Sequence, residues 1–426
     1  MRLLKIVVVT LVALAIWALL VLAGAREGWW RPLPAPRGNA AAFLDAVKAK
    51  IARLSNGDAA VALIAGGRVV GETFASRGRP VDRSSLFQVA SMSKWVTAWG
   101  VMALVEKGRI DLDAPVSRYL RRWRLPPSAF DNDAVTVRRL LSHTAGLTDG
   151  LGYRGFAPGE KLQSIEASLT HAADAMPSSP GSVRVGLAPG SQWRYSGGGY
   201  TLLQLIIEEV SGEPFNAYMR RAVLVPLGMR ESTFVAPDPA RLADDFGPDG
   251  KPATRYTFTA LAPASLYTST GDMTRFLLAQ IAGPHGEAPG RGVLSPATLE
   301  AMRRPQARLF SLPIWGLGNA LYVDNNQGGF VIGHDGNNYP AINTTARLDP
   351  ATGDGIVVLE TGNAALASET GGDWTFWHSG HVDIVAIFYD ARSLQAILAA
   401  GALVIVAAAG LIAWRGRRRK AAPPPS

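Results

Sequence analysis

Two long stretches without a charged residue constrain this chain more than any other feature. Residues 6–25 form one such stretch of 20 residues, and residues 394–414 form another of 21. At a rise of about 1.5 Å per residue, a helix of either length reaches roughly 30 Å, the thickness of the hydrocarbon core of a bilayer. The sequence therefore predicts two transmembrane helices in a lipid bilayer, with the 368 residues 26–393 between them.

The net charge of +9 is concentrated at the two ends of the chain. Residues 1–5 and 415–420 carry seven lysines and arginines and no acidic residue, which leaves about +2 on the rest. A nucleic-acid-binding protein carries its basic surface on the folded domain, so we expect no nucleic-acid partner. Positive residues that flank transmembrane helices mark the cytoplasmic side. We therefore expect a cell inner membrane protein whose central domain faces the periplasm.

The first apolar stretch allows a second interpretation. Ala23-Gly24-Ala25 resembles a cleavage site, so residues 1–25 could be a removable signal peptide. However, the stretch is longer than the usual signal core of about 7–15 residues, and Trp29 and Trp30 follow where an aromatic belt would lie. We favour a retained anchor. The expected order is an anchor or signal peptide (1–25), a proline-rich linker (26–39), a folded domain (40–393), a transmembrane helix (394–414) and a basic cytoplasmic tail (415–426).

The pattern of apolar residues predicts an α+β domain. Helical spacing is found at 40–54, 92–107 and 201–210, and in pieces between 115 and 141. Strand patterns are found at 59–65, 68–74, 330–332, 341–348 and 355–360. Because strands lie at both ends of the domain, we expect one antiparallel sheet of N- and C-terminal strands with a large, mostly helical insertion.

Cysteine is missing from the sequence, which excludes a disulfide framework, a thiolate metal site and a thiol nucleophile. His378 and His381 have the spacing of two metal ligands on a helix, but no third ligand is evident. We therefore expect neither a metal nor a cofactor.

Ser91 and Lys94 are three residues apart at the expected start of a helix, so both should project from one face. A lysine that is desolvated in a cleft can be neutral enough to take the proton of a serine hydroxyl. Ser93 lies about 200° around the helix from Ser91, so we expect Ser93→Ala to leave substantial activity. The pair could equally be a surface serine and a solvated lysine, because S-x-x-K alone is a weak signal.

Two later segments of the sequence strengthen the interpretation of Ser91 and Lys94 as catalytic residues. Trp193-Arg194-Tyr195-Ser196-Gly197-Gly198-Gly199-Tyr200 is a glycine-rich turn before an apolar helix, and Gly333-His334-Asp335-Gly336-Asn337-Asn338 follows a predicted strand. With Ser91 and Lys94, these segments resemble the three ordered motifs of the serine β-lactamase and penicillin-binding-protein superfamily, closest to its class C and esterase-like branch. The segments 108–115, 140–147 and 265–273 also resemble that family. The resemblance implies the β-lactamase/transpeptidase-like fold.

The resemblance also implies roles for individual residues. Ser91 would be the acylated nucleophile, Lys94 would accept its proton or hold the base in place, and Tyr195 would relay a proton to the leaving group. The resemblance leaves open which of Lys94 and Tyr195 is the base. Main-chain N–H groups of Ser91 and Asn337 would form the oxyanion hole. His334 would stand in the place of the strand lysine, and Gly336 would let the substrate approach that strand closely.

The chain departs from the family pattern at two positions. The asparagine of the second motif falls on Gly197, which has no amide to hold an acylamino side chain. His334 replaces a lysine, so a fixed positive charge becomes dependent on pH. Both departures argue against a genuine β-lactamase or carboxypeptidase and leave the acylation residues intact. His143 is interpreted as a structural residue of a buried loop.

We therefore expect a membrane-anchored serine hydrolase that forms an acyl-enzyme with an ester, amide or lactam, either a small molecule or a cell-wall-derived compound. The alternative is a non-catalytic sensor or binding module for cell-wall peptides. The intact Ser91, Lys94 and Tyr195 argue against that alternative. The short tails at both ends also argue against it, because they leave no room for a signalling domain.

The charge asymmetry makes a prediction about topology. Periplasm-specific reporters inserted within residues 40–390 should be active, and fusions after Lys420 should report the cytoplasm, because both basic ends stay inside. Enzymatic reporter fusions along the chain measure this directly. A cytoplasmic signal from the central domain would contradict an outward-facing enzyme.

Overall fold

An eight-stranded antiparallel sheet lies at the centre of the domain in the computed structural model, which describes residues 2–150, 152–309, 311–389 and 391–421. The order of its strands is β2-β1-β10-β9-β8-β7-β6-β5, so the N-terminal hairpin pairs with the C-terminal strand. The strands are β1 (Ala59–Ala65), β2 (Arg68–Ala75), β5 (Ala307–Leu309), β6 (Leu312–Trp315), β7 (Ala320–Asp324), β8 (Phe330–Asn338), β9 (Ile342–Asp349) and β10 (Asp354–Thr361). The short strands β3 (Phe87–Gln88) and β4 (Tyr267–Thr268) form a separate pair.

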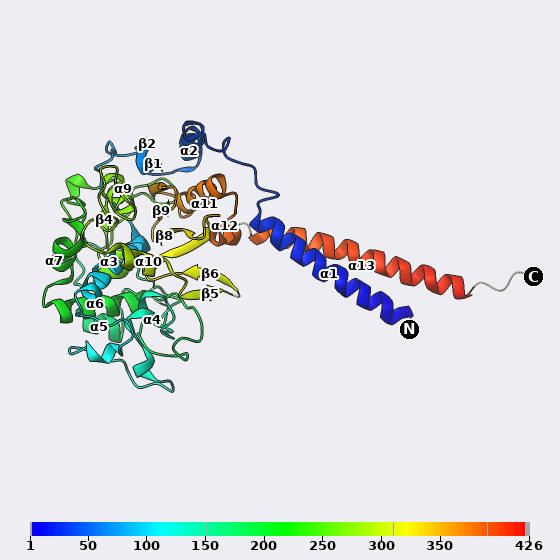
Figure 1. Cartoon of the computed structure of the whole chain (residues 1–426), viewed down its shortest axis with the longest axis horizontal. Coiled ribbons are helices and arrows are strands. Elements are labelled where there is room, and N and C mark those ends of the chain that lie inside the picture. Colours follow the sequence, from blue (N-terminus) through cyan, green and yellow to red (C-terminus); the bar gives the residue numbers. More distant parts are fainter. Residues whose placement is uncertain (1, 151, 310, 390, 422–426) are drawn as a thin grey trace, which may run out of the picture.

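Helices cover both faces of this sheet and fill the insertion between β2 and β5 (Figure 1). Those of the N-terminal half are α1 (Arg2–Arg26), α2 (Ala40–Leu54), α3 (Ser93–Glu106), α4 (Val137–Leu141), α5 (Ile165–Thr170) and α6 (Gly197–Ser211). Those of the C-terminal half are α7 (Phe215–Met219), α8 (Leu261–Ala264), α9 (Thr270–Leu278), α10 (Pro296–Arg303), α11 (Leu366–Ser379), α12 (Ile384–Tyr389) and α13 (Ala391–Ala421). Short turns of 3₁₀ or π geometry lie at 90–92, 116–118, 132–134, 220–224 and 239–241.

The central strands are buried on both faces. Successive side chains point to opposite sides of the sheet, and helices cover both of these sides. In β1, Ala60 and Ala62 belong to the main core, which includes residues of α3, whereas Val61 and Leu63 pack with residues of α2 and α11. Strand β10 repeats this division between the two clusters, and β9 is buried along its whole length. The sheet is thus the middle of three layers.

Most of the expected elements are present. The expected helix at 40–54 and strand at 59–65 match α2 and β1, and the expected antiparallel sheet with a mostly helical insertion is confirmed. Strands β5, β6 and β7 were not expected, because their runs are too short to give a pattern. The strand expected at 330–332 extends to Asn338, so the third motif lies within β8 and does not follow a strand.

A buried arginine fixes β8 and β9 against the C-terminal helices. Arg347 is fully buried, pairs with Asp383, and lies 3.2 Å from the Oδ2 atom of Asp335. Its guanidinium also lies 3.8 Å from the centre of the Tyr322 ring. A buried cation must be compensated by nearby negative charge. The two carboxylates do this, and they tie β8 to the segment before α12.

Helices α1 and α13 form an antiparallel pair that extends away from the domain, with the start of α1 and the end of α13 at its far end (Figure 1). The Trp17 indole N–H donates to the carbonyl of Leu398 at 3.2 Å. A Cβ atom at Gly401 would lie 2.1 Å from the Trp17 ring, so glycine permits this approach. Residues 4–26 and 393–415 are long and apolar enough to cross a membrane, by length and composition.

Candidate active site

Ser91 lies on a tight 3₁₀ turn, Ala90–Met92, between β3 and α3. Ala90 has a φ of +47°, an unfavourable conformation for a residue with a Cβ atom, so neighbouring contacts must hold the turn. Ser93 provides two of them: its hydroxyl donates to the Ala90 carbonyl at 2.6 Å and accepts from the Leu266 N–H at 2.9 Å. Ser93 thus stabilises the turn that carries Ser91, a role that its position on the helix does not reveal.

Lys94 lies in the first turn of α3 and is almost completely buried. Its Nζ atom is 3.0 Å from the Oγ atom of Ser91 and 2.8 Å from the carbonyl oxygen of Pro263. The same atom lies over the rings of Tyr195 and Tyr200, 4.9 and 5.7 Å from their centres. Burial lowers the pKa of Lys94 to about 7, although the charge of Asp149 acts in the opposite direction. Near neutral pH the amine is therefore partly uncharged.

Tyr195 reaches Ser91 from the segment that precedes α6. Burial raises the pKa of Tyr195 well above its ordinary value, and a hydrogen bond with Ser91 opposes this shift only in part. The ring therefore remains a neutral phenol, able to donate a proton. Ser91, Lys94 and Tyr195, which are separated by up to about a hundred residues in sequence, are brought together as expected.

Asp149 and Ser196 hold the segment of Tyr195 in place. The Ser196 hydroxyl caps α6 by accepting from the Gly199 N–H at 2.8 Å, and it donates to Asp149 at 2.6 Å. The other carboxylate oxygen of Asp149 accepts from the Gly198 N–H at 3.1 Å. The glycines expected to form a turn are thus the first turn of α6, because Ser196 supplies an N-cap that starts the helix at Gly197. Asp149 was not among the residues expected at the site.

Gly336 lies against the main chain that leads to Ser91. A Cβ atom at this position would lie 2.1 Å from the carbonyl oxygen of Val89, two residues before Ser91. The same carbonyl accepts a hydrogen bond from Thr344 Oγ1 on β9, at 3.0 Å. Glycine is therefore required so that β8 can pack directly against the main chain that leads to Ser91.

Asn337 is placed at the edge of the cavity that contains Ser91. Its side chain donates to the carbonyl of Ala364. Strand β7 pairs with β8 only as far as Gly333, and no other described strand pairs with that edge beyond this point. This edge of β8, where Asn337 lies, therefore faces the cavity.

His334 is buried behind Tyr195 and is not among the described residues that line the cavity. Its ring centre lies 6.4 Å from that of Tyr195 and 5.3 Å from that of Trp315. The Nδ1 atom donates to the Asp335 carbonyl at 2.6 Å, because a carbonyl can only accept. Burial and the nearby Lys94 lower the pKa of His334 to about 3. The imidazole is thus uncharged throughout the neutral range.

His143 packs against Tyr195 outside the described lining of the cavity, and the sequence predicts a structural role for it. Its ring lies 4.3 Å from that of Tyr195 and 5.0 Å from that of Trp315, measured between centres. The Nδ1 atom accepts from the Ser196 N–H at 3.2 Å. Burial and Lys94 lower the pKa of His143 well below its ordinary value. His143 is thus a buried residue that supports the position of Tyr195.

The cavity at Ser91 has a volume of about 220 Å³. Small and apolar residues make up much of its lining, which includes Gly150, Gly152, Met176, Gly197, Pro263 and Ala264. Lys94 is the one charged residue in the described part of this lining. His378 and His381 are the two residues with the spacing of metal ligands. His378 lies at the end of α11 and His381 just after it, and neither belongs to the described lining of this cavity. They contact Asp349 and Asn326, respectively, at 2.8 and 3.2 Å.

Comparison with known proteins gives the family of this chain. Residues 45–395 match the Beta-lactamase family, so the chain belongs to this family of serine hydrolases. Esterase EstB of Burkholderia gladioli is 30% identical over 57% of this chain and 67% of its own length. Penicillin-binding protein 4 of Amycolatopsis lactamdurans is 28% identical over 68% of this chain and 76% of its own. A solved structure, the octameric penicillin-binding protein homologue from Pyrococcus abyssi, has a TM-score of 0.60 and 23% identity, and the alignment covers 78% of this chain and 76% of that one.

A role for Lys94 as proton acceptor predicts the pH dependence of activity. The kcat/KM for an uncharged ester should rise with pH along a limb centred near pH 7, because only the neutral amine can accept the proton of Ser91. His334, with a pKa of about 3, is already neutral below this range. The measurement is a kcat/KM profile between pH 5 and 9. Lys94→Arg should abolish the limb together with turnover, since a guanidinium keeps its proton. A wild-type profile that is flat from pH 5 to 8 would exclude Lys94 as the acceptor.

Proposed function

We propose that this protein is a membrane-anchored serine hydrolase that cleaves small, uncharged esters through an acyl-enzyme on Ser91. The observation that carries the proposal is the 3.0 Å contact between Lys94 Nζ and Ser91 Oγ, made by an amine whose pKa is about 7. Nucleophile and base are thus within hydrogen-bond reach in a water-poor site. The similarity to an esterase, EstB, supports the same reaction class.

The proposed acylation begins when Lys94 takes the proton from the Ser91 hydroxyl. The serine oxygen attacks the ester carbonyl, and the resulting oxyanion accepts hydrogen bonds from the main-chain N–H groups of Ser91 and Asn337. Tyr195 relays the proton from Lys94 to the departing alcohol oxygen as the ester bond breaks. Water then attacks the acyl-enzyme, the same groups accept its proton, and the acid leaves while Ser91 regains its hydrogen. Lys94 is the better base, because burial disfavours a Tyr195 phenolate.

The size and charge of the cavity favour a small, uncharged acyl group. At about 220 Å³, the cavity is smaller than the usual 300–1,000 Å³ of a site for a drug-sized ligand. A substrate carboxylate would need a cation, but His334 is neutral and Lys94 must lose its charge to act as a base. Carboxylate-bearing lactams and cell-wall peptides are therefore poorer substrates than simple esters.

We propose that α1 and α13 anchor the enzyme in the inner membrane with the domain in the periplasm. Their antiparallel packing supports this topology, because it brings both basic ends to the same side (Figure 1). In that arrangement residues 26–39 act as a short linker and residues 415–426 as a cytoplasmic tail.

Loss of Ser91 should abolish covalent labelling. Ser91→Ala should remove both the adduct with a fluorophosphonate probe and ester turnover, because the hydroxyl is the group acylated. The measurement is intact-protein mass spectrometry after probe treatment. Ser84→Ala is the matched control, since Ser84 is exposed and its hydroxyl donates to the neighbouring Asp82. Ser93→Ala is unsuitable as a control, because Ser93 holds the turn of Ser91. Labelling that persists in Ser91→Ala would refute the assignment, and the sensor alternative predicts that the wild type has no ester turnover.

Small esters should be cleaved far better than cephalosporins. Gly197 lines the cavity and cannot supply the amide that would pair with an acylamino side chain. An unpaired buried polar group costs about 1–3 kcal/mol, or one to two powers of ten in rate. The test compares kcat/KM for a p-nitrophenyl ester and a chromogenic cephalosporin in the wild type and in Gly197→Asn, which should shift the ratio towards the lactam. Efficient cephalosporin hydrolysis by the wild type would overturn this substrate assignment.

A further inference from the structure

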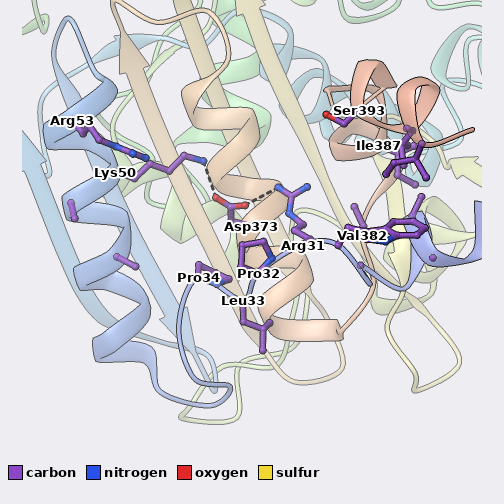
Figure 2. Close-up of a pocket in the computed structure, with 18 residues that line it drawn as sticks. Arg31, Pro32, Leu33, Pro34, Lys50, Arg53, Asp373, Val382, Ile387 and Ser393 are labelled. Atoms are coloured by element: carbon purple, nitrogen blue, oxygen red, sulfur yellow. Dashed lines mark hydrogen bonds and ion pairs between the residues drawn. The ribbon is translucent and has the colours of Figure 1, made fainter. Parts of the chain in front are cut away.

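A second and larger cavity lies where the two long helices meet the domain. Its volume is about 770 Å³, and it shares no described lining residue with the cavity at Ser91. Its walls come from the end of α1, the linker 31–34, one face of α2, α11, and the first turns of α13. Figure 2 shows the linker residues Pro32, Leu33 and Pro34 crossing beside Asp373 of α11.

One side of this cavity carries an excess of positive charge. Asp373 accepts from Arg31 at 2.7 Å and from Lys50 at 2.8 Å (Figure 2), and the Lys50 Nζ atom also lies 3.6 Å from the Oε2 atom of Glu369. Arg53 lies three residues after Lys50 on the same face of α2, and its side chain is exposed. Three basic residues of the described lining thus face two acidic residues, Asp373 within the lining and Glu369 beside it. This side would attract an anion.

The other side of the cavity is apolar and continues onto the membrane-length helices. It is formed by Trp30, Leu33, Val382, Ile387, Leu394 and Ile397. Leu394 and Ile397 are three residues apart on α13, so they lie on one face at the start of the apolar segment 393–415. Trp29 and Trp30 are exposed next to the end of α1, as is typical of side chains at the surface of a bilayer.

We propose that this cavity binds one anionic phospholipid. The phosphate lies between Lys50 and Arg53, and an acyl chain follows Leu394 and Ile397 into the bilayer. The combination favours a lipid over a free anion, because an inorganic anion would leave the apolar wall exposed to water. This inference rests on the membrane anchoring proposed above, and it does not involve the chemistry at Ser91. The bound lipid fixes the domain against the membrane surface through the linker and α2.

The test uses the full-length protein purified in a mild, uncharged detergent. Dioleoyl phosphatidylglycerol and dioleoyl phosphatidylcholine are added separately, and native mass spectrometry measures the fraction of protein that retains one lipid. We expect phosphatidylglycerol to be retained at least about fivefold more strongly, because each lysine or arginine near an anionic headgroup contributes a factor of about five. Arg53→Gln should lose most of this preference.

Lys48→Gln is the matched control, because Lys48 is exposed on α2 but lies outside the cavity lining. It removes the same charge and should keep the preference. Equal retention of both lipids by the wild type, or an equal loss in both variants, would overturn the proposal. Full displacement of the lipid by millimolar inorganic phosphate would show an anion site without an acyl chain, which also contradicts it.

Ester turnover of the same samples separates this proposal from the hydrolase assignment. Lipid preference without turnover would refute only the hydrolase, and turnover without lipid preference would refute only the lipid site. If the full chain stays in the soluble fraction after cell lysis, membrane anchoring and the lipid site both fail, while the hydrolase assignment stands.

Discussion

The burial of a single ammonium group, that of Lys94, is the constraint on which the rest of the site depends. Its water is replaced by the Ser91 hydroxyl, the Pro263 carbonyl and the faces of two tyrosine rings, which are weaker partners than water. The amine therefore has a pKa near 7. His143 and His334 are buried next to Lys94. Their own burial and the nearby Lys94 charge lower the pKa of both histidines, so both imidazoles are neutral. Compensating charge comes from Asp149, which also holds the start of α6.

Three separate parts of the chain must meet for this burial to occur. The turn of Ser91 carries a strained Ala90, and it keeps its shape because β8 packs against Val89 at Gly336 and because Ser93 bonds to the Leu266 N–H. Strand β8 is held from its other face by Asp335, which pairs with the buried Arg347. The position of the nucleophile is thus determined by contacts on both faces of the sheet.

The two cavities differ in size and in the charge of their lining residues. The one at Ser91 is small and has few charges, which suits a neutral acyl group that enters a desolvated site. The one at the base of the domain is basic on one side and apolar on the other, which suits a molecule that is itself divided in this way. The linker and α2 contact the second cavity, and the sheet lies between α2 and the nucleophile helix α3. The proposed attachment to the membrane is therefore separated by the sheet from the residues proposed for acylation.

Periodicity and motif spacing in the sequence alone determined the central strands, the flanking helices, the two apolar spans and the pair Ser91 and Lys94, and the resemblance to a known family added Tyr195. These features depend on local patterns, which short segments carry by themselves. Only the tertiary structure decided the packing of Gly336, the neutral state of His334 and the position of Asp149 at the site. The close approach of Val89 to Gly336, and the burial that removes the charge of His334, arise from segments that are distant in the sequence. A local pattern contains no information on desolvation, because desolvation depends on everything packed around a group.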